Sequence, residues 1–166
     1  FAGQESAKLF GIDPNIVKII HYGLDLSLFD NPTPKNFVAR RLLNAGTLIR
    51  KKGMFELVDV FNSIAQEDKE ATLYLIGADS PDALTGSPST WALIKNQFLK
   101  RTHYLGKVPY GDMQQHIRDA HVCIFPSKAE TLGMVTIESM AMFKPVVNTN
   151  YGWAQELIDD GLNGYK

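Results

Sequence analysis

The sequence has very little cysteine, no long apolar run and almost no net charge. Its one cysteine, Cys123, cannot form a disulfide within the chain, and it lies in the apolar run 122–125 as a buried structural thiol would. The lack of a disulfide framework is typical of a reducing compartment, so we expect a cytoplasmic protein. No apolar run approaches the ~20 residues of a membrane-spanning helix, so we expect at most peripheral membrane association.

The 17 basic and 18 acidic side chains leave a formal net charge of -1. A chain this close to neutral has no overall field that attracts nucleic acid, so we expect no nucleic-acid partner. Motifs of a P-loop and of a nucleophile elbow are missing, and the histidines lack the spacing of a metal site. The histidines are His21, His103, His116 and His121. We therefore expect neither a metal ion nor another cofactor, and any bound anion needs a local site.

Short β-rich runs alternate with helical segments through most of the chain. The predicted strands are 42–46, 71–77, 102–106, 121–125 and 145–149, and the predicted helices are 53–66, 90–100, 112–120, 134–143 and 152–159. Asp112 is the expected N-cap of the third helix. This alternation, with strands that are apolar on both faces, predicts an α/β fold with a parallel sheet and helices on both faces. Residues 1–20 predict a further helix and strand before this body.

Ligands of such sheets bind beyond the carboxyl ends of the strands. The segment 46–53 follows the first strand and holds two glycines and three consecutive cations, Arg50, Lys51 and Lys52. It also opens a helix, whose first N–H groups are unpaired and carry partial positive charge. A phosphate site and a solvated basic turn are equally good interpretations of this segment.

A second candidate segment follows the fourth strand. Gly133 permits a tight turn, and its N–H group and those of Met134 and Val135 would point outward at the start of a helix. Glu130 and Glu138 lie on either side of this anion site, where they suit sugar hydroxyls better than phosphate. The alternative is a dipole partner and a surface residue, but an idle Glu138 in a mostly apolar helix would be costly.

Two further segments give weaker signals. The segment 104–110 follows the third strand, and its backbone and apolar side chains could flank a base. The segment 150–156 follows the fifth strand, where a simple capped helix explains the residues as well as a binding role does.

A set of ordered motifs resembles the C-terminal domain of retaining GT-B glycosyltransferases of the glycosyltransferase family 4 (group 1) type, from about His21 to the last residue. Tyr22-Gly23-Leu24-Asp25 is similar to the Asn-Gly-Val-Asp linker motif, Gly46 to Gly53 to Gly-Arg-Leu-x-x-x-Lys-Gly, and Glu130 to Glu138 to the Glu-x7-Glu motif. Pro126-Ser127, Pro145-Val146-Val147, Gly152 to Glu156 and Gly161-Leu162-Asn163-Gly164 also match.

The resemblance implies a role for each matched position. Glu138 would hold the ribose hydroxyls of a nucleotide sugar, and Glu130 would contact the donor sugar as the catalytic carboxylate. The backbone at Gly133, Met134 and Val135 would hold the diphosphate, Lys52 would neutralise it, and Lys107 and Val108 would flank the base. This family needs no metal, because cations and helix N-termini stabilise the leaving diphosphate.

Two departures from the family pattern bear on the expected donor site. Thr47 stands where the family has its phosphate-binding arginine, and Arg50 or Lys51 is a candidate substitute. Trp153 replaces the second glycine of Gly-Gly-x-x-Glu near the expected sugar.

The predicted fold is therefore a Rossmann-like domain, the C-terminal half of a GT-B glycosyltransferase. Residues 1–30 are expected to be the tail of an N-terminal domain and a linker, and residues 31–166 a donor-binding domain truncated at its C-terminal end. The expected activity is transfer of a hexose from a UDP- or GDP-linked sugar to an acceptor, with retention, by a full-length hexosyltransferase that has an N-terminal acceptor-binding domain. The fragment alone should be inactive.

Two alternatives remain. One is the half-domain of a GT-B nucleotide-sugar epimerase or phosphorylase, and the spacing of Glu130 and Glu138 argues against it. The other is a non-catalytic flavodoxin-like binding module, which predicts no nucleotide binding and tolerance of Glu138→Ala.

Overall fold

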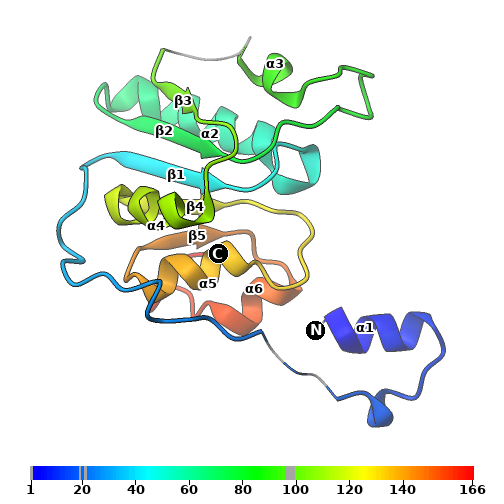
Figure 1. Cartoon of the computed structure of the whole chain (residues 1–166). Coiled ribbons are helices and arrows are strands. Elements are labelled where there is room, and N and C mark those ends of the chain that lie inside the picture. The colour runs from blue at the N-terminus through cyan, green and yellow to red at the C-terminus, as the bar shows by residue number, and fades with distance from the viewer. Residues whose placement is uncertain (1, 19, 21, 96–99) are drawn as a thin grey trace.

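A computed structural model of the chain describes residues 2–18, 20, 22–95 and 100–166. Its centre is a sheet of five parallel strands in the order β3-β2-β1-β4-β5 (Figure 1). The strands are β1 (Arg41–Ala45), β2 (Thr72–Ile76), β3 (Thr102–Tyr104), β4 (Val122–Phe125) and β5 (Val146–Asn148). The five predicted strands and their parallel arrangement are confirmed, because apolar residues on both faces favour a strand that helices cover on both sides.

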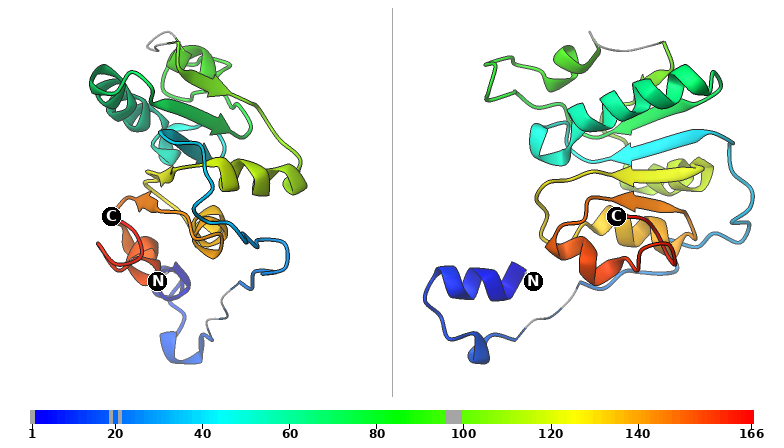
Figure 2. Two further views of the ribbon diagram at one scale, coloured as in Figure 1. Left: turned by 90° about the vertical axis from the view of Figure 1, so that its left-hand side faces the viewer. Right: turned by 180° about the vertical axis from the view of Figure 1, so that it is seen from behind.

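Helices cover both faces of this sheet. They are α2 (Met54–Glu67), α3 (Thr90–Lys95), α4 (Tyr110–Asp119), α5 (Met134–Ala141) and α6 (Gly152–Leu157). In Figure 2, α2 and α6 lie on one face, and α4 and α5 lie on the other. The predicted helix 90–100 is described as far as Lys95, and residues 96–99 lie outside the described residues.

Neighbouring residues of β1 face the two separate cores. Leu42 packs with Phe61 of α2 and Ile94 of α3, whereas Leu43 packs with Ile117 of α4 and Cys123 of β4. The Cys123 thiol is buried, so the prediction of a buried thiol is confirmed. Burial raises its pKa to about 11.

The expected N-cap of α4 was wrong. The helix begins at Tyr110 with Pro109 as its N-cap, and Asp112 lies inside the first turn. Pro109 takes an extended conformation, with φ of −56° and ψ of 145°, and its carbonyl accepts from the N–H of Asp112 at 2.9 Å. Proline has the φ angle that a helix start requires, so the helix begins two residues earlier than the carboxylate pattern indicated.

The strand predicted within residues 1–20 is absent from the described residues there. This segment holds α1 (Ala2–Leu9) and a 3-10 turn, η1 (Pro14–Ile16). Figure 1 places α1 apart from the sheet, and Ile12 and Ile16 are exposed. A strand needs a neighbour for its backbone hydrogen bonds, and this segment lies beside no edge of the sheet.

The last residues return to the free edge of β5. The N–H of Asn148 donates to the carbonyl of Tyr165 at 2.8 Å, and the N–H of Tyr165 donates to the carbonyl of Val146 at 2.9 Å. Tyr165 is therefore in parallel register with β5.

Candidate functional site

Two adjoining cavities lie at the carboxyl ends of the strands. The larger has a volume of about 390 Å³. It is lined by Ala45, Gly46, Thr47, Ile76, Gly77, Ala78, Lys107, Val108, Tyr110, Met113, Met134, Val135 and Glu138. The smaller, about 10 Å³, has room for roughly one water molecule. It is lined by Asn44, Ala45, Gly46, Lys52, Phe125, Ser127, Glu130, Gly133, Val135, Thr136 and Trp153. Both cavities are lined by Ala45, Gly46 and Val135, so they adjoin each other.

The loop after β1 packs directly on the loop after β4. Gly53 has φ of 70°, and a Cβ atom at this position would stand 2.0 Å from the carbonyl oxygen of Pro126. The N–H of Lys128 donates to the carbonyl of Lys51 at 2.7 Å. This contact brings together the two segments that the sequence indicated as separate anion sites.

The start of α5 is open toward the cavities. Gly133 is the N-cap, with φ of 73°, and no side chain caps the helix. The first-turn residues Met134 and Val135 line the larger cavity. Uncapped N–H groups and the partial positive charge of a helix start favour an anion here. A Cβ atom at Gly133 would stand 2.7 Å from the ring of Trp153, so the buried indole packs directly against this turn.

The carboxylate of Glu138 lies one turn into α5 at the wall of the larger cavity. Only 7% of the residue is exposed. The Tyr110 hydroxyl donates a hydrogen bond to Oε1 of Glu138 at 3.0 Å. Burial raises the pKa of Glu138, and the hydrogen bond from Tyr110 opposes that rise. The alternative interpretation, that Glu138 is a surface residue, is therefore wrong.

The carboxylate of Glu130 lies at the smaller cavity and is paired with Lys52. The Nζ of Lys52 donates to Oε1 of Glu130, and the two side chains are 22% and 18% exposed. The Ser127 hydroxyl donates to the same oxygen at 3.1 Å. A cation and a carboxylate from two loops therefore neutralise each other beside the start of α5.

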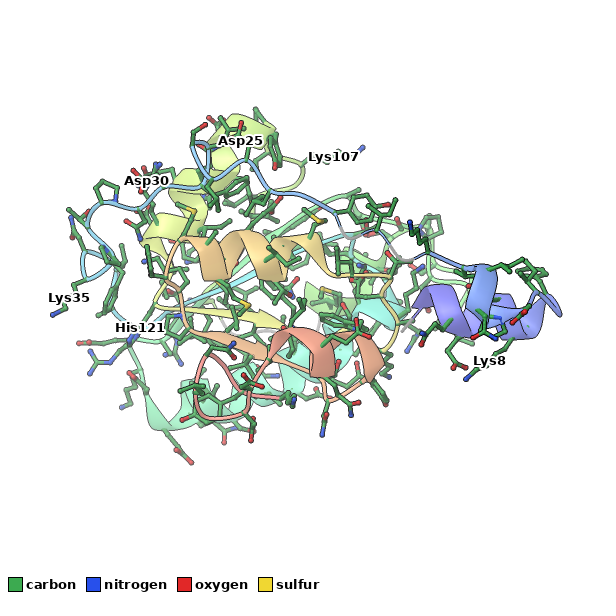
Figure 3. The ribbon with its side chains drawn as sticks, turned by 90° about the horizontal axis from the view of Figure 1, so that it is seen from below. Lys8, Asp25, Asp30, Lys35, Lys107 and His121 are labelled. Atoms are coloured by element: carbon green, nitrogen blue, oxygen red, sulfur yellow. The ribbon has the colours of Figure 1, made fainter. Side chains whose placement is uncertain are left out.

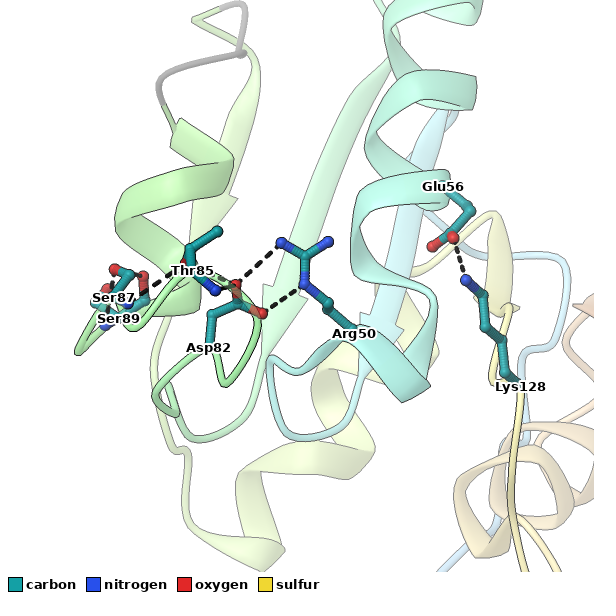
Figure 4. A network of polar contacts seen from close by, with 7 residues as sticks. All are labelled: Arg50, Glu56, Asp82, Thr85, Ser87, Ser89 and Lys128. Atoms are coloured by element: carbon teal, nitrogen blue, oxygen red, sulfur yellow. Dashed lines mark hydrogen bonds and ion pairs between the residues drawn. The ribbon is translucent and has the colours of Figure 1, made fainter.

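Arg50 does not enter either cavity. Its Nε and Nη2 donate to Oδ1 and Oδ2 of Asp82 at 2.6 and 3.0 Å (Figure 4). The guanidinium also lies over the Phe55 ring, 4.2 Å from its centroid. Hydrogen bonds from Arg50 and Thr85 lower the pKa of Asp82 to about 2. These contacts tie the loop after β1 to the loop after β2, and they hold Arg50 away from the predicted phosphate position.

The structure brings nearly all the predicted site residues together. Thr47, Lys107, Val108, Met134, Val135 and Glu138 line the larger cavity, and Lys52, Glu130 and Gly133 line the smaller. The exceptions are Arg50 and Lys51, which line neither cavity. Some polar residues of the site were not predicted, among them Tyr110 and Asn44. A buried carboxylate implies some hydrogen-bond donor, but no sequence pattern identifies Tyr110 as that donor.

Asn44 lies on β1 and lines the smaller cavity. Its Nδ2 donates to the carbonyl of Ile124 at 2.6 Å, and its buried Oδ1 has no partner among the described residues. An asparagine in the middle of an apolar strand was the only sequence signal for it.

The described residues contain no group of three or more His, Cys, Asp or Glu side chains arranged to hold a metal ion. Within the same part of the chain, every helix is too short or too polar to cross a membrane.

The chain has a five-stranded parallel sheet with interleaved helices and a candidate site at the carboxyl ends of the strands. These features define its fold class. It is the fold of the C-terminal half of GT-B glycosyltransferases. The family model for glycosyl transferases group 1 matches residues 39–166, and the chain belongs to this family.

Relatives and solved structures agree with this assignment. An uncharacterized glycosyltransferase of Methanocaldococcus jannaschii is 29% identical over 146 residues, 88% of this chain and 38% of its own length. The putative teichuronic acid biosynthesis glycosyltransferase TuaC of Bacillus subtilis is 27% identical, over 93% of this chain and 38% of its own. HepE of Anabaena, in a crystal structure with UDP-glucose, has a TM-score of 0.78 and 26% identity, and the match covers 98% of this chain and 46% of HepE. The chain thus spans less than half of the length of each of these proteins.

Proposed function

We propose that this chain is the donor-binding half of a retaining hexosyltransferase that uses a nucleotide diphosphate sugar. The observation that carries the proposal is the start of α5, where uncapped N–H groups lie between Glu138 and the Lys52–Glu130 pair. Such a helix start suits a diphosphate, and a carboxylate on each side suits the hydroxyls of a ribose and of a sugar. The binding of UDP-glucose by HepE favours a uridine nucleotide.

In the proposed arrangement the donor lies in the larger cavity and runs toward the smaller one. The base lies in the larger cavity near Lys107 and Val108. The ribose hydroxyls donate hydrogen bonds to the carboxylate of Glu138. The diphosphate then lies at the N–H groups of Met134 and Val135, close to Gly46, which lines both cavities. The sugar reaches Glu130 at the smaller cavity.

The Lys52–Glu130 pair opens when the donor binds. The diphosphate offers an anion to Lys52, and the sugar hydroxyls donate to Glu130, so each charged group exchanges one partner for another. When the bond between the sugar and the diphosphate breaks, the departing oxygen takes the electron pair. Lys52 and the helix start then stabilise that charge without requiring a metal ion.

The acceptor side of the reaction belongs to another part of the protein. We assign residues 1–30 to the tail of an N-terminal acceptor-binding domain and its linker, and residues 31–166 to the donor domain in a cytoplasmic enzyme. Large apolar side chains of the first segment, such as Leu9, Phe10 and Ile20, are exposed, as expected for residues that pack on that domain. The chain alone therefore has no transferase turnover.

Calorimetric titration with UDP, GDP and ADP tests donor binding, with Glu138→Ala as the comparison. Selective binding of one nucleotide at high-micromolar to millimolar affinity, about 4–6 kcal/mol, is expected, and the variant should lose it. Binding of all three nucleotides alike, or unchanged binding by Glu138→Ala, contradicts the proposed site.

A non-catalytic binding module is the second candidate, and one arrangement favours it. Thr47 gives the larger cavity no cation at the place where the family has arginine, and Lys52 already has Glu130 as its partner. This candidate predicts a folded domain that binds none of the three nucleotides.

A further inference from the structure

The carboxylate of Glu138 has a single hydrogen-bond partner among the described residues, the Tyr110 hydroxyl at 3.0 Å. A carboxylate this far buried must be oriented by donors, because burial disfavours its charge. Tyr110 is 57% exposed and lines the larger cavity, so its hydroxyl lies at the boundary between the protein and any ligand there.

The second oxygen of the carboxylate has a different environment. Oε2 of Glu138 accepts no hydrogen bond from the described residues, yet it is not one of the sealed polar atoms that lack a partner. It therefore keeps some accessible surface, on a residue that lines the larger cavity. One oxygen is bound by the protein, and the other can accept a hydrogen bond from a ligand.

The Tyr110 ring also contacts an aromatic side chain of the segment before β1. It makes an edge contact with the Phe29 ring, with centroids 5.8 Å apart and planes at 69°. Phe29 is buried and lies in the segment that precedes β1. Figure 3 shows Asp25 of this segment on the same side of the molecule as Lys107, which lies three residues before Tyr110. The segment before β1 thus helps to hold the ring in place.

We propose that Tyr110 is a positioning residue of the ribose site, which holds Oε1 of Glu138 so that Oε2 meets the ribose hydroxyls. This inference rests on the proposed donor-binding function and adds a residue to it. Tyr110 acts through Glu138, and the contribution of its hydroxyl therefore depends on a ligand that has ribose hydroxyls.

The test compares UDP with 2′,3′-dideoxy-UDP, which lacks both ribose hydroxyls. Both ligands are titrated by NMR, which measures weak binding, into the chain and into its Tyr110→Phe variant. Loss of the phenol hydroxyl should weaken UDP about tenfold, as expected for a hydrogen bond to a charged group, and change dideoxy-UDP by less than about twofold. Tyr165→Phe, at another exposed tyrosine that lines neither cavity, is the matched control and should change neither affinity.

The outcomes separate this inference from the function on which it rests. No binding of UDP by the unaltered chain overturns the proposed function. If the chain binds UDP but Tyr110→Phe binds it equally well or more tightly, the positioning role alone is overturned. Equal losses on both ligands overturn it too, because a general packing role would weaken them alike. A thermal unfolding scan of each variant confirms that the domain is folded.

Discussion

Lys52 and Glu130 are 78 residues apart in the sequence and form an ion pair beside the start of α5. The pair joins the loop after β1 to the loop after β4, which are also in contact through Gly53 and Pro126. Because each group has an oppositely charged partner, both charges are compensated without a bound ligand. A donor must compete with this pair, so both residues should affect the affinity for the diphosphate more than that for the nucleoside.

Replacing Lys52 tests its role toward phosphate. Lys52→Met should weaken UDP about tenfold, because a charge-assisted contact to the diphosphate is lost, and should leave uridine affinity unchanged. Calorimetry or NMR titration gives both affinities. Lys128→Met is the control, since Lys128 pairs with Glu56 and lines neither cavity. Equal losses in the two lysine variants would argue against the assignment.

Restoring the missing family arginine should strengthen donor binding. Thr47 lines the larger cavity, so Thr47→Arg places a guanidinium near the expected diphosphate. We expect UDP to bind about tenfold more tightly, with a gain that shrinks as salt is added. Thr47→Gln introduces a long polar side chain without the charge of arginine and should leave the UDP affinity unchanged. A Thr47→Arg variant that is folded but no tighter places the diphosphate elsewhere.

Arg50 should matter for stability rather than for donor binding. Its guanidinium is held by both oxygens of Asp82 and by the Phe55 ring. Arg50→Gln should lower the Tm and leave the UDP affinity within about twofold. Because the pKa of Asp82 is lowered to about 2, its stabilising effect is present above pH 3.8 and is lost as the pH falls toward 2. The Tm difference between the chain and Arg50→Gln should therefore shrink in that range, and a difference that stays constant would contradict this role.

The ionised carboxylate of Glu138 should destabilise the fold at neutral pH, although it is needed for binding. Burial raises its pKa above the ordinary 4.5, so the unfolded chain loses this proton at lower pH than the folded chain does. Stability from this group is greatest at low pH and falls as the pH rises through the raised pKa. Glu138→Gln removes the charge, and its Tm should match that of the chain near pH 4 and exceed it at pH 7. A variant less stable at pH 7 would show that the ionised carboxylate is a net structural asset.

The sequence predicted the sheet and most of the site because both depend on local patterns. Apolar runs such as 121–125 identify buried strands, and the loops after parallel strands meet at one edge whatever their sequence separation. That geometry was enough to place Glu130 and Glu138 on either side of the start of α5.

The features that the sequence did not predict depend on contacts between residues that are far apart in the sequence. Arg50 was a candidate phosphate ligand until the loop after β2 supplied Asp82, thirty-two residues away. Tyr110 gained its role from Glu138, and no spacing rule links the two. The prediction of a strand before residue 20 was wrong for a similar reason. A strand forms only where a neighbouring strand offers backbone hydrogen bonds.

NMR mapping of bound UDP on the isotopically labelled chain tests the central claim most directly. The account predicts that the backbone N–H signals of Gly133, Met134 and Val135 shift most, together with those of Lys107 and Val108. Glu138→Ala should abolish these shifts. Saturating UDP that moves none of these signals, or shifts that gather at the hollow around Phe143 and Leu162 instead, would contradict a donor site at the start of α5.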